Sequence, residues 1–427
     1  MNATNATNPY GIKLLSGWKE STLGEVTDNP KSFIQTGPFG SQLHAHDYKS
    51  EGVPVVMPQQ LGDNRINLEG IARISEEDCT RLSRHIMEEG DIVFSRRGDV
   101  TRRAIITSQE AGYLCGTGCL LIRLKHPRID NRFVSLFFSL PQFKEYIVQK
   151  AVGATMPNLN TGILKRIPLV MPVFETQKRI VDVLSAYDDL IENNRRRMVL
   201  LEESARLLYQ EWFVRLRFPG HEHVRIVKGL PEGWKTGHFS EFVDYLEGPG
   251  LLNRQYRDEG IPFLNIRTIK DDDIDFTKVQ YLQEGEVEAK YKHFLLAEDD
   301  HVVSSSGTLG RVVTIRACHI PVMLNTSLIR MRPRSYLSKW FIKAYLKHGD
   351  YADQVTSMAT GAAQLNYGPS HLAKLHFKVP TPQLAALYDE FVAPCYTQIK
   401  TLLDVNLKLR TARDLLLPRL MSGEVAV

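Results

Sequence analysis

The strongest constraint on this fold is that the sequence repeats itself at a shift of about 208 residues, from near its start to near its end. Residues 48–54, Tyr-Lys-Ser-Glu-Gly-Val-Pro, recur as residues 256–262, Tyr-Arg-Asp-Glu-Gly-Ile-Pro. Further matches in the same order are Gly17-Trp18-Lys19 with Gly233-Trp234-Lys235, Asp28 with Asp244, residues 91–98 with 300–307, Arg102 with Arg311, Leu159-Asn160 with Leu365-Asn366, and Pro172 with Pro380. Because these matches are colinear, the sequence predicts two homologous units.

Each unit begins with a mixed segment of about 160 residues. In the first unit, glycines and prolines separate short apolar, β-branched runs, which predict strands joined by turns. These runs lie at residues 52–57, 91–95, 104–107 and 120–124. One helix is expected over residues 133–149.

Each unit ends with an apolar pattern whose steps alternate between four and three residues. In the first unit its positions are Ile180, Leu184, Tyr187, Ile191, Asn194, Met198, Leu201, Ala205, Leu208 and Trp212. The same phase continues in the second unit at Tyr388, Val392, Cys395, Ile399, Leu402, Asn406, Leu409, Arg413, Leu416 and Leu420. Such alternation is typical of a coiled-coil seam. We therefore predict two long helices, each about 50 Å long, that pair antiparallel within the chain.

The predicted helix pair makes three local features testable. Antiparallel alignment places Asn194 opposite Asn406, either as a hydrogen-bonded pair that fixes the register or as two amides that face solvent. Thr381 and Pro382 are a favourable N-cap and first residue for the second helix. Pro394 is expected to kink or split that helix and leave residues 383–393 as a separate short helix.

The composition excludes several classes of protein. A length of 427 residues suggests two to three domains, and a net charge of +4 permits a nucleic-acid partner without requiring one. Five scattered cysteines fit a reducing cytoplasm, and Cys115-x3-Cys119 lacks a second ligand pair, so no zinc site is expected. No apolar run is long enough to span a membrane. Residues 1–14 lack the features of a signal peptide and are expected to form a disordered tail.

Side chains suited to DNA gather after the predicted strands. Arginine reaches phosphates or guanine edges, Gln and Asn pair with base edges, and small hydroxyl residues let backbone amides approach phosphates. The candidates are Gln59, Gln60, Arg96, Arg97, Arg102 and Arg103 in the first unit, and Asn265, Arg267, Lys270, Ser304, Ser305, Ser306, Thr308 and Arg311 in the second. The alternative for the segments around Gly98 and Gly307 is a pair of solvated hairpin tips.

No pattern for catalysis accompanies these candidates. The chain has neither a Walker loop nor an Asn/Asp-Pro-Pro-Tyr/Phe methyltransferase motif, and its glycine pairs do not form a nucleotide-binding fingerprint. We therefore predict no enzymatic activity and no cofactor. The alternatives are an enzyme with a cryptic active site and a coiled-coil adaptor that binds only proteins.

The order of these features resembles the specificity subunits of Type I restriction–modification enzymes over essentially the whole chain. The most specific pieces are the Pro172-x4-Gln177 helix entry and the closing run Leu-Leu-Leu-Pro-Arg-Leu-Met-Ser-Gly-Glu-Val at residues 415–425. Asn406 and Arg413 depart from the family's apolar seam.

This resemblance implies an α+β fold in which two β-rich target-recognition domains are separated by two long antiparallel coiled-coil helices, in a pseudo-two-fold internal repeat. Each domain would read half of a bipartite site on double-stranded DNA. The helices would set the gap and dock two modification (methyltransferase) subunits, which restriction (motor and nuclease) subunits would join. The expected limits are a tail at 1–14, recognition domains at 15–172 and 219–380, and spacer helices at 173–218 and 381–427.

Overall fold

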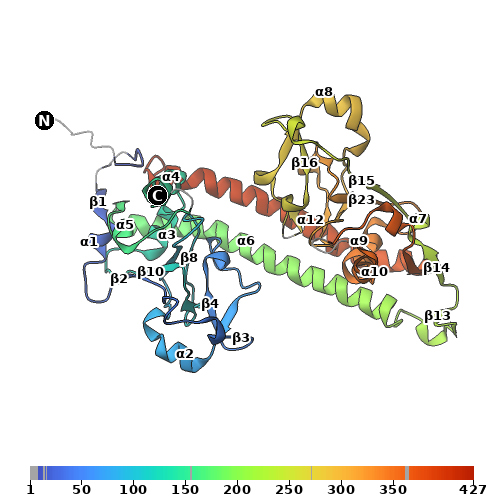
Figure 1. Ribbon diagram of the computed structural model, residues 1–427, viewed down its shortest axis with the longest axis horizontal. Coiled ribbons are helices and arrows are strands. Elements are labelled where there is room, and N and C mark those ends of the chain that lie inside the picture. The colour runs from blue at the N-terminus through green and yellow to red at the C-terminus, as the bar shows by residue number, and fades with distance from the viewer. Residues whose placement is uncertain (1–7, 13–14, 16, 154–155, 271, 361–364) are drawn as a thin grey trace. The chain divides into compact units, whose positions relative to one another are not determined.

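The structure is a computed structural model that describes all residues except 1–7, 13–14, 16, 154–155, 271 and 361–364. It divides into two compact units, the first formed by residues 1–191 and 408–427 and the second by residues 192–407. The long helices α6 (Phe174–Tyr209) and α12 (Pro382–Met421) each contribute to both units (Figure 1).

The β-rich region of the first unit contains three sheets. The largest has the strand order β2-β10-β7-β8-β5, and it is antiparallel except where β5 meets β8. Its strands are β2 (Phe33–Thr36), β5 (Asp63–Asn64), β7 (Ile92–Ser95), β8 (Arg103–Ile105) and β10 (Cys119–Arg123). A four-stranded sheet has the order β3-β6-β4-β9, with β3 (Tyr48–Lys49), β4 (Val53–Val56), β6 (Ala72–Ile74) and β9 (Leu114–Cys115). Strands β1 (Lys19–Thr22) and β11 (Pro168–Met171) pair where the chain enters and leaves the region.

The second unit repeats this topology. Its main sheet has the order β15-β23-β20-β21, and a three-stranded sheet has the order β19-β16-β22. The strands are β15 (Val243–Glu247), β16 (Ile261–Leu264), β19 (Gln280–Leu282), β20 (His301–Ser304), β21 (Val312–Thr314), β22 (Met323–Leu324) and β23 (Leu328–Pro333). Three two-stranded pairs complete it: β12 (Ile226–Val227) with β13 (Leu230–Pro231), β14 (Lys235–His238) with β24 (His376–Val379), and β17 (Ile269–Lys270) with β18 (Asp273–Ile274). The strand order of the main sheet, apart from β5, and that of the smaller sheet, apart from β3, are the same in both units, as the predicted homology implies.

Short helices occur in the same order in both regions. The first unit has α1 (Leu23–Val26), α2 (Glu76–Arg81), α3 (Asn131–Phe137), α4 (Pro141–Lys150) and α5 (Thr161–Lys165). The second has α7 (Phe239–Phe242), α8 (Glu284–Glu286), α9 (Lys339–His348), α10 (Tyr351–Met358) and α11 (Pro369–Leu372). The single helix expected over residues 133–149 is wrong, because Pro141 occupies the first turn of α4, where its fixed φ begins a new helix.

Helices α6 and α12 pack antiparallel within each unit. In the second unit, Asn194 contacts Asn406 and Tyr209 lies 6.3 Å from Tyr388 between ring centroids. In the first unit, Ile180, Leu184, Leu417 and Leu420 share one buried core. The Oγ1 atom of Thr381 accepts a hydrogen bond from Leu384 N at 3.3 Å, which confirms the predicted N-cap.

The predicted break at Pro394 is wrong, because α12 is continuous from Pro382 to Met421. Pro394 lies on the exposed side of the helix, whereas Val392 and Tyr396 on either side of it are buried in one core. Burial of these side chains offsets the backbone hydrogen bond that a proline cannot donate.

The structure describes residues 8–12 of the expected disordered tail, and there the expectation fails. Asn8, Tyr10 and Ile12 are buried. The Tyr10 ring packs edge-on against Phe137 at 5.2 Å, and its hydroxyl donates to Pro168 O at 2.8 Å. This stretch is therefore part of the first unit's core.

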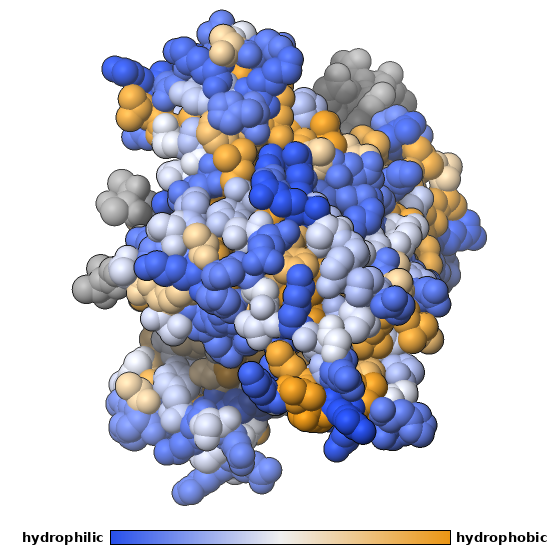
Figure 2. Space-filling model, turned by 90° about the vertical axis from the view of Figure 1, so that its right-hand side faces the viewer, coloured by the Kyte–Doolittle hydropathy of each residue, from blue (hydrophilic) through white to orange (hydrophobic). Residues whose placement is uncertain are grey.

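Figure 2 shows a face on which hydrophilic residues predominate, with smaller hydrophobic areas between them. Within the described ranges, no helix is both long enough and apolar enough to cross a membrane.

Candidate nucleic-acid interface

A tight turn between β9 and β10, residues 116–118, is the point where three loops of the first unit meet. Gly37 N donates to Cys119 O at 2.9 Å, and the Thr117 hydroxyl donates to Pro38 O at 3.0 Å. Arg96 N donates to Gly118 O at 2.8 Å. Residues 57–60 approach the same turn, since a Cβ added to Gly118 would lie 3.2 Å from Pro58 Cγ. We call residues 116–118 the central turn and residues 37–43, 57–60 and 95–102 the reading loops of the first unit.

The second unit assembles the same arrangement around residues 325–327, its central turn. Gly248 N donates to Leu328 O at 3.1 Å, and a Cβ on Gly248 would lie only 2.3 Å from Asn325 O. Ser305 N donates to Ser327 O at 3.0 Å, and Ile266 N donates to Ser327 Oγ at 3.2 Å. The reading loops of this unit are residues 248–255, 265–270 and 304–311.

The repeated Ser-x-x-Gly segment is closed by the same backbone hydrogen bond in both units. Ser95 N donates to Arg102 O at 2.9 Å, and Ser304 N donates to Arg311 O at 3.0 Å. Gly98 and Gly307 have φ values of 75° and 69°, which glycine adopts without steric cost.

An asparagine on a distant segment pairs with each of these loops. Arg97 forms a β-bridge with Asn158, and Ser306 forms one with Asn366. The structure therefore equates Asn158 with Asn366, two positions away from the sequence match of Leu159-Asn160 with Leu365-Asn366, which is wrong in register. Asn160 instead caps helix α5, where its Oδ1 accepts from Ile163 N at 2.8 Å.

Most predicted contact residues lie at or near the surface of the reading loops. Gln59, Arg97, Arg102, Arg267, Lys270, Thr308 and Arg311 are exposed, and Asn265 is half-buried. Arg96 and Ser306 are half-buried, and the Arg96 guanidinium lies 6.0 Å from the centre of the Phe39 ring. The structure thus brings together, within each unit, candidates that are far apart in sequence.

Two of these arginines already have partners in the protein. Arg102 Nε lies 3.3 Å from Asp99 Oδ2. Partial burial raises the pKa of Asp99, but hydrogen bonds from Thr101 and Arg102 outweigh it and hold that pKa below its usual value. Arg311 Nη1 donates to Ile269 O at 3.1 Å. A guanidinium carries five N–H groups, so one intramolecular contact leaves others able to donate elsewhere.

Four predicted contact residues are buried and leave the candidate set, namely Arg103, Gln60, Ser304 and Ser305. Arg103 is fully buried, and its guanidinium donates to Ser135 O at 3.2 Å and to the Ser139 hydroxyl. Gln60 is 4% exposed and accepts from Met57 N through Oε1, and Ser305 is 2% exposed. Strands β8 and β20 are covered on both faces. The usual alternation of buried and exposed residues along a strand therefore does not bring Arg103 or Ser305 to the surface.

The first reading loop of each unit was not among the predicted contact segments. Phe39 is 55% exposed and Leu252 is 54% exposed. The signal was present as Gly37-Pro38 and Gly248-Pro249, a match that precedes the Tyr48 and Tyr256 segments but is offset by a three-residue difference in loop length.

The predicted seam residues lie between α6 and α12 within the units. Ile180, Leu184, Ile191, Asn194, Val392, Ile399, Leu402 and Asn406 are buried, and Met198, Leu201, Leu208, Leu409 and Leu416 are half-buried. Asn194 Nδ2 donates to Asn406 Oδ1 at 2.8 Å, so the predicted amide pair is confirmed and the solvent-facing alternative is wrong. Arg413 is accommodated by Asp188, whose Oδ1 lies 2.5 Å from Nη1.

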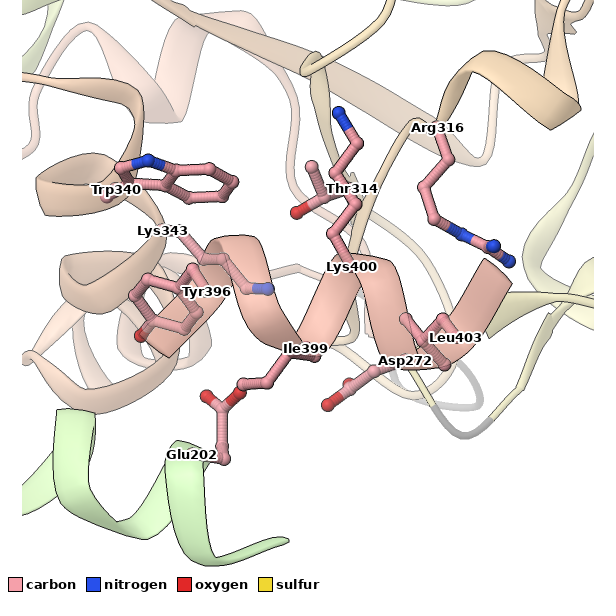
Figure 3. A pocket seen from close by; sticks show the side chains of 10 residues that line it. All are labelled: Glu202, Asp272, Thr314, Arg316, Trp340, Lys343, Tyr396, Ile399, Lys400 and Leu403. Carbon is pink, nitrogen blue, oxygen red and sulfur yellow. The ribbon is translucent and has the colours of Figure 1, made fainter. Parts of the chain in front are cut away.

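A small cavity lies where the second unit's β-rich region meets the two helices (Figure 3). It has a volume of about 30 Å³ and is lined by Glu202, Asp272, Thr314, Arg316, Trp340, Lys343, Tyr396, Ile399, Lys400 and Leu403. A cavity of this size admits one or two water molecules and no cofactor-sized ligand.

Buried charges surround this cavity. Burial alone would raise the pKa of Glu202, but the hydrogen bond from His348 and the charges of Lys347 and Lys343 lower it to about 2. Burial lowers the pKa of Lys343 to about 8 despite the attraction of Glu202. The Lys343 ammonium lies 4.4 Å from the centre of the Tyr396 ring.

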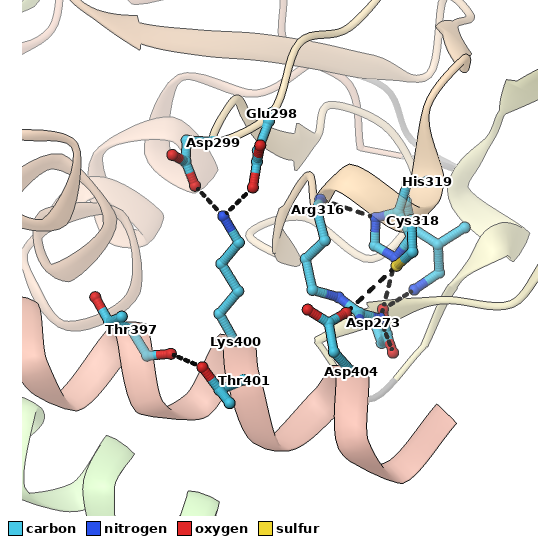
Figure 4. A network of polar contacts seen from close by, with 11 residues as sticks. Asp273, Glu298, Asp299, Arg316, Cys318, His319, Thr397, Lys400, Thr401 and Asp404 are labelled. Atoms are coloured by element: carbon cyan, nitrogen blue, oxygen red, sulfur yellow. Dashed lines mark hydrogen bonds and ion pairs between the residues drawn. The ribbon is translucent and has the colours of Figure 1, made fainter. Parts of the chain in front are cut away.

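Ion pairs attach the second β-rich region to α12 beside the cavity (Figure 4). Lys400 Nζ lies 2.5 Å from Glu298 Oε1 and 2.8 Å from Asp299 Oδ1. Arg316, which is almost fully buried, bridges Asp404 on the helix and Asp273, whose Oδ1 is 2.6 Å from Nη2. These ion pairs hold the β-rich region of the second unit against α12, and this structural role accounts for the charged side chains.

The chain is similar in sequence to known proteins of one family. The model of the Type I restriction modification DNA specificity domain matches residues 16–203. The Type I restriction enzyme MjaIX specificity subunit of Methanocaldococcus jannaschii is 22% identical over 400 residues, which cover 89% of this chain and 88% of that protein. The HindI specificity subunit of Haemophilus influenzae is 21% identical over an alignment that covers 96% of this chain and all of that protein.

A solved structure shares the fold. The Type I restriction–modification S subunit from M. genitalium superposes with a TM-score of 0.55 at 16% sequence identity, over 98% of each chain.

Proposed function

Because this chain belongs to the specificity subunits of Type I restriction–modification systems, we propose that each of its β-rich regions reads one half of a bipartite double-stranded DNA site. As a specificity subunit it supplies DNA recognition and is a non-catalytic member of its complex. The proposed recognition domains are residues 15–172 and 219–380, and the proposed spacer segments are residues 173–218 and 381–427.

The observation that carries the proposal is the central turn with its three reading loops, which occurs once in each unit. The backbone contacts of the two arrangements are equivalent, whereas their exposed side chains differ. Gln59, Arg97 and Arg102 occupy the first, and Arg267, Lys270 and Arg311 occupy the second. Since hydrogen-bonding side chains in the grooves specify bases, two such surfaces with different side chains would read two different half-sites.

We propose that α6 and α12 set the unread gap between the half-sites. Helix α6 has 36 residues and rises about 54 Å at 1.5 Å per residue. The heptad phase continues in both helices without insertion. A helix pair of constant length would hold the spacing constant, as a split site requires.

We propose that two modification subunits dock on these helices and that restriction subunits join them in the cytoplasm, where the DNA lies. Large apolar side chains are exposed on both helices at positions related by the 208-residue shift. The related pairs are Val183 with Phe391, Val199 with Leu407, and Leu207 with Leu415. Exposed apolar side chains repeated in this way fit two copies of one protein partner.

Methylation mapping tests the recognition proposal. Cells that carry this chain and its modification subunits should methylate a genomic motif with two specified halves and an unspecified gap. Exchange of residues 15–172 for the first domain of another specificity subunit should replace one half only. A motif without a gap, or an exchange that alters both halves, would contradict the proposal.

The alternatives predict different results. Methylation of DNA by the chain alone, when it is supplied with a methyl donor, would indicate a cryptic enzyme. A complete complex that leaves no sequence-dependent footprint on DNA would indicate an adaptor that binds only proteins.

A further inference from the structure

Phe39 and Leu252 occupy equivalent positions on the first reading loops of the two units. Phe39 N donates to Gln42 Oε1 at 3.0 Å, and Gln42 N donates to Phe39 O at 2.8 Å. Leu252 N donates to Gln255 Oε1 at 2.8 Å, and Gln255 N donates to Leu252 O at 2.8 Å. The same pair of bonds therefore presents a large apolar side chain in both units, although the loops differ in length and sequence.

Both side chains are held outward by a fixed backbone. The loop of Phe39 is closed by Gly37, whose close approach to Gly116 leaves no space for a side chain, and by Leu43, which is 4% exposed. In the second unit, Gln255 Nε2 also donates to Glu286 Oε1 at 2.8 Å and to the Tyr291 hydroxyl at 3.1 Å. Because the residues that anchor these loops are packed, the loop conformation itself holds the Phe39 and Leu252 side chains in solvent.

Phe39 and Leu252 lie on the same loop clusters as the residues predicted to contact DNA. The Phe39 ring lies 6.0 Å from the Arg96 guanidinium, and Pro38 O accepts a hydrogen bond from the Thr117 hydroxyl of the central turn. Gly248, four residues before Leu252, packs against the second central turn. An apolar side chain has no group that binds a phosphate, so its complement on DNA is a base, through the thymine methyl group or a base face.

We propose that Phe39 and Leu252 are specificity-determining residues that contact a base of the half-site read by their own domain. This inference rests on the proposed function and adds to it an apolar contact beside the polar ones. A phenyl ring and a leucine side chain differ in shape, so the two domains would favour different bases at this point.

The test uses the assembled complex of this chain with its modification subunits and starts from the motif mapped for the unaltered chain. Phe39→Ala should weaken binding to a duplex carrying that motif about ten- to hundredfold, the range measured when aromatic contacts to bases are removed. It should also relax base preference in one half-site and leave the other unchanged, and Leu252→Ala should do the reverse. Phe39→Leu keeps an apolar tip and should alter the preferred base with a smaller loss of affinity.

Matched controls are Val148→Ala and Ile226→Ala, which remove side chains that are 48% and 58% exposed and lie outside the reading loops. These variants should bind like the unaltered chain. The inference is overturned if the Phe39 and Leu252 variants keep affinity and base preference, if they weaken all sequences equally, or if they weaken subunit assembly without changing base preference. If the unaltered chain yields no two-part motif, the proposed function itself fails, which is a separate result.

Discussion

The side chain of Asn194 on α6 donates a hydrogen bond to the side chain of Asn406 on α12, with 2.8 Å between Nδ2 and Oδ1. The two residues are 7% and 1% exposed and lie in an otherwise largely apolar seam. A buried amide is satisfied only when its partner lies in the same layer, so this pair favours one register of the helices over registers shifted by a turn or a heptad.

Asn194→Ala should lower the free energy of unfolding by about 1–3 kcal/mol, because it removes the donor to a buried amide oxygen. The double variant Asn194→Leu, Asn406→Leu should be close to neutral in stability but should admit other registers. Denaturant unfolding measures the first effect, and cross-linking of cysteines placed along the helices measures the second. A double variant that keeps a single register would show that the amide pair does not select it.

Insertion of one heptad into each helix at the Asn194–Asn406 layer should lengthen the unread gap of the DNA site by about three base pairs. Seven residues add about 10.5 Å of helix, and the duplex rises about 3.4 Å per base pair. Methylation mapping would report the new motif. The half-sites should stay as they are, and a change in either half would contradict the spacer model.

Arg316→Met should destabilise the second unit by about 3 kcal/mol, since it removes the buried cation that bridges Asp273 and Asp404. Lys400→Met is the matched comparison and should cost about 0–1 kcal/mol, because the Lys400 side chain is 22% exposed whereas that of Arg316 is 3% exposed. Denaturant unfolding of both variants checks the difference. Equal losses would show that burial of the Arg316 bridge is not what anchors the region to α12.

Lys343→Met should stabilise the chain at pH 7, and the advantage should disappear as the pH rises. The folded-state pKa of Lys343 is about 8, below its usual 10.5, so the buried cation is a cost whenever Lys343 is protonated. Between pH 8 and 10.5 the unfolded chain binds this proton and the folded chain does not, so the stability of the unaltered chain rises relative to the variant by up to about 3 kcal/mol. Unfolding measured across this window tests the sign, and a difference independent of pH would contradict it.

The repeat, the strands and the helix seam could be predicted because each depends on a pattern spread over many residues. The colinear matches determine the repeated topology, and the alternation of four and three residues determines which face of each helix is buried. The pairing of Asn194 with Asn406 could also be predicted, because antiparallel alignment of the two seams places these asparagines opposite each other.

Single residues were harder, since local rules compete with burial. Pro394 violates a backbone rule, yet the packed side chains of Val392 and Tyr396 keep α12 continuous. The Gly37 and Gly248 loops were missed because their Gly-Pro match is offset by a three-residue difference in loop length, and because the sequence does not show that these loops converge on one turn.

Arg102 and Arg103 illustrate the limit most directly, and they lead to a test of the candidate interface. Arg102 directly precedes β8 and is exposed, whereas Arg103 begins the strand and is buried against α3. Arg97→Ala and Arg102→Ala should therefore weaken DNA binding by the assembled complex, and each lost phosphate contact should reduce the salt dependence of binding by about one unit of slope. Arg103→Met should instead lower the stability of the first unit by about 1–3 kcal/mol, through the carbonyl and hydroxyl acceptors that it leaves behind. Binding titrations at several salt concentrations, paired with denaturant unfolding, separate the two effects. If Arg97→Ala and Arg102→Ala leave both affinity and salt slope unchanged, the loops around the central turn are not where this domain meets DNA.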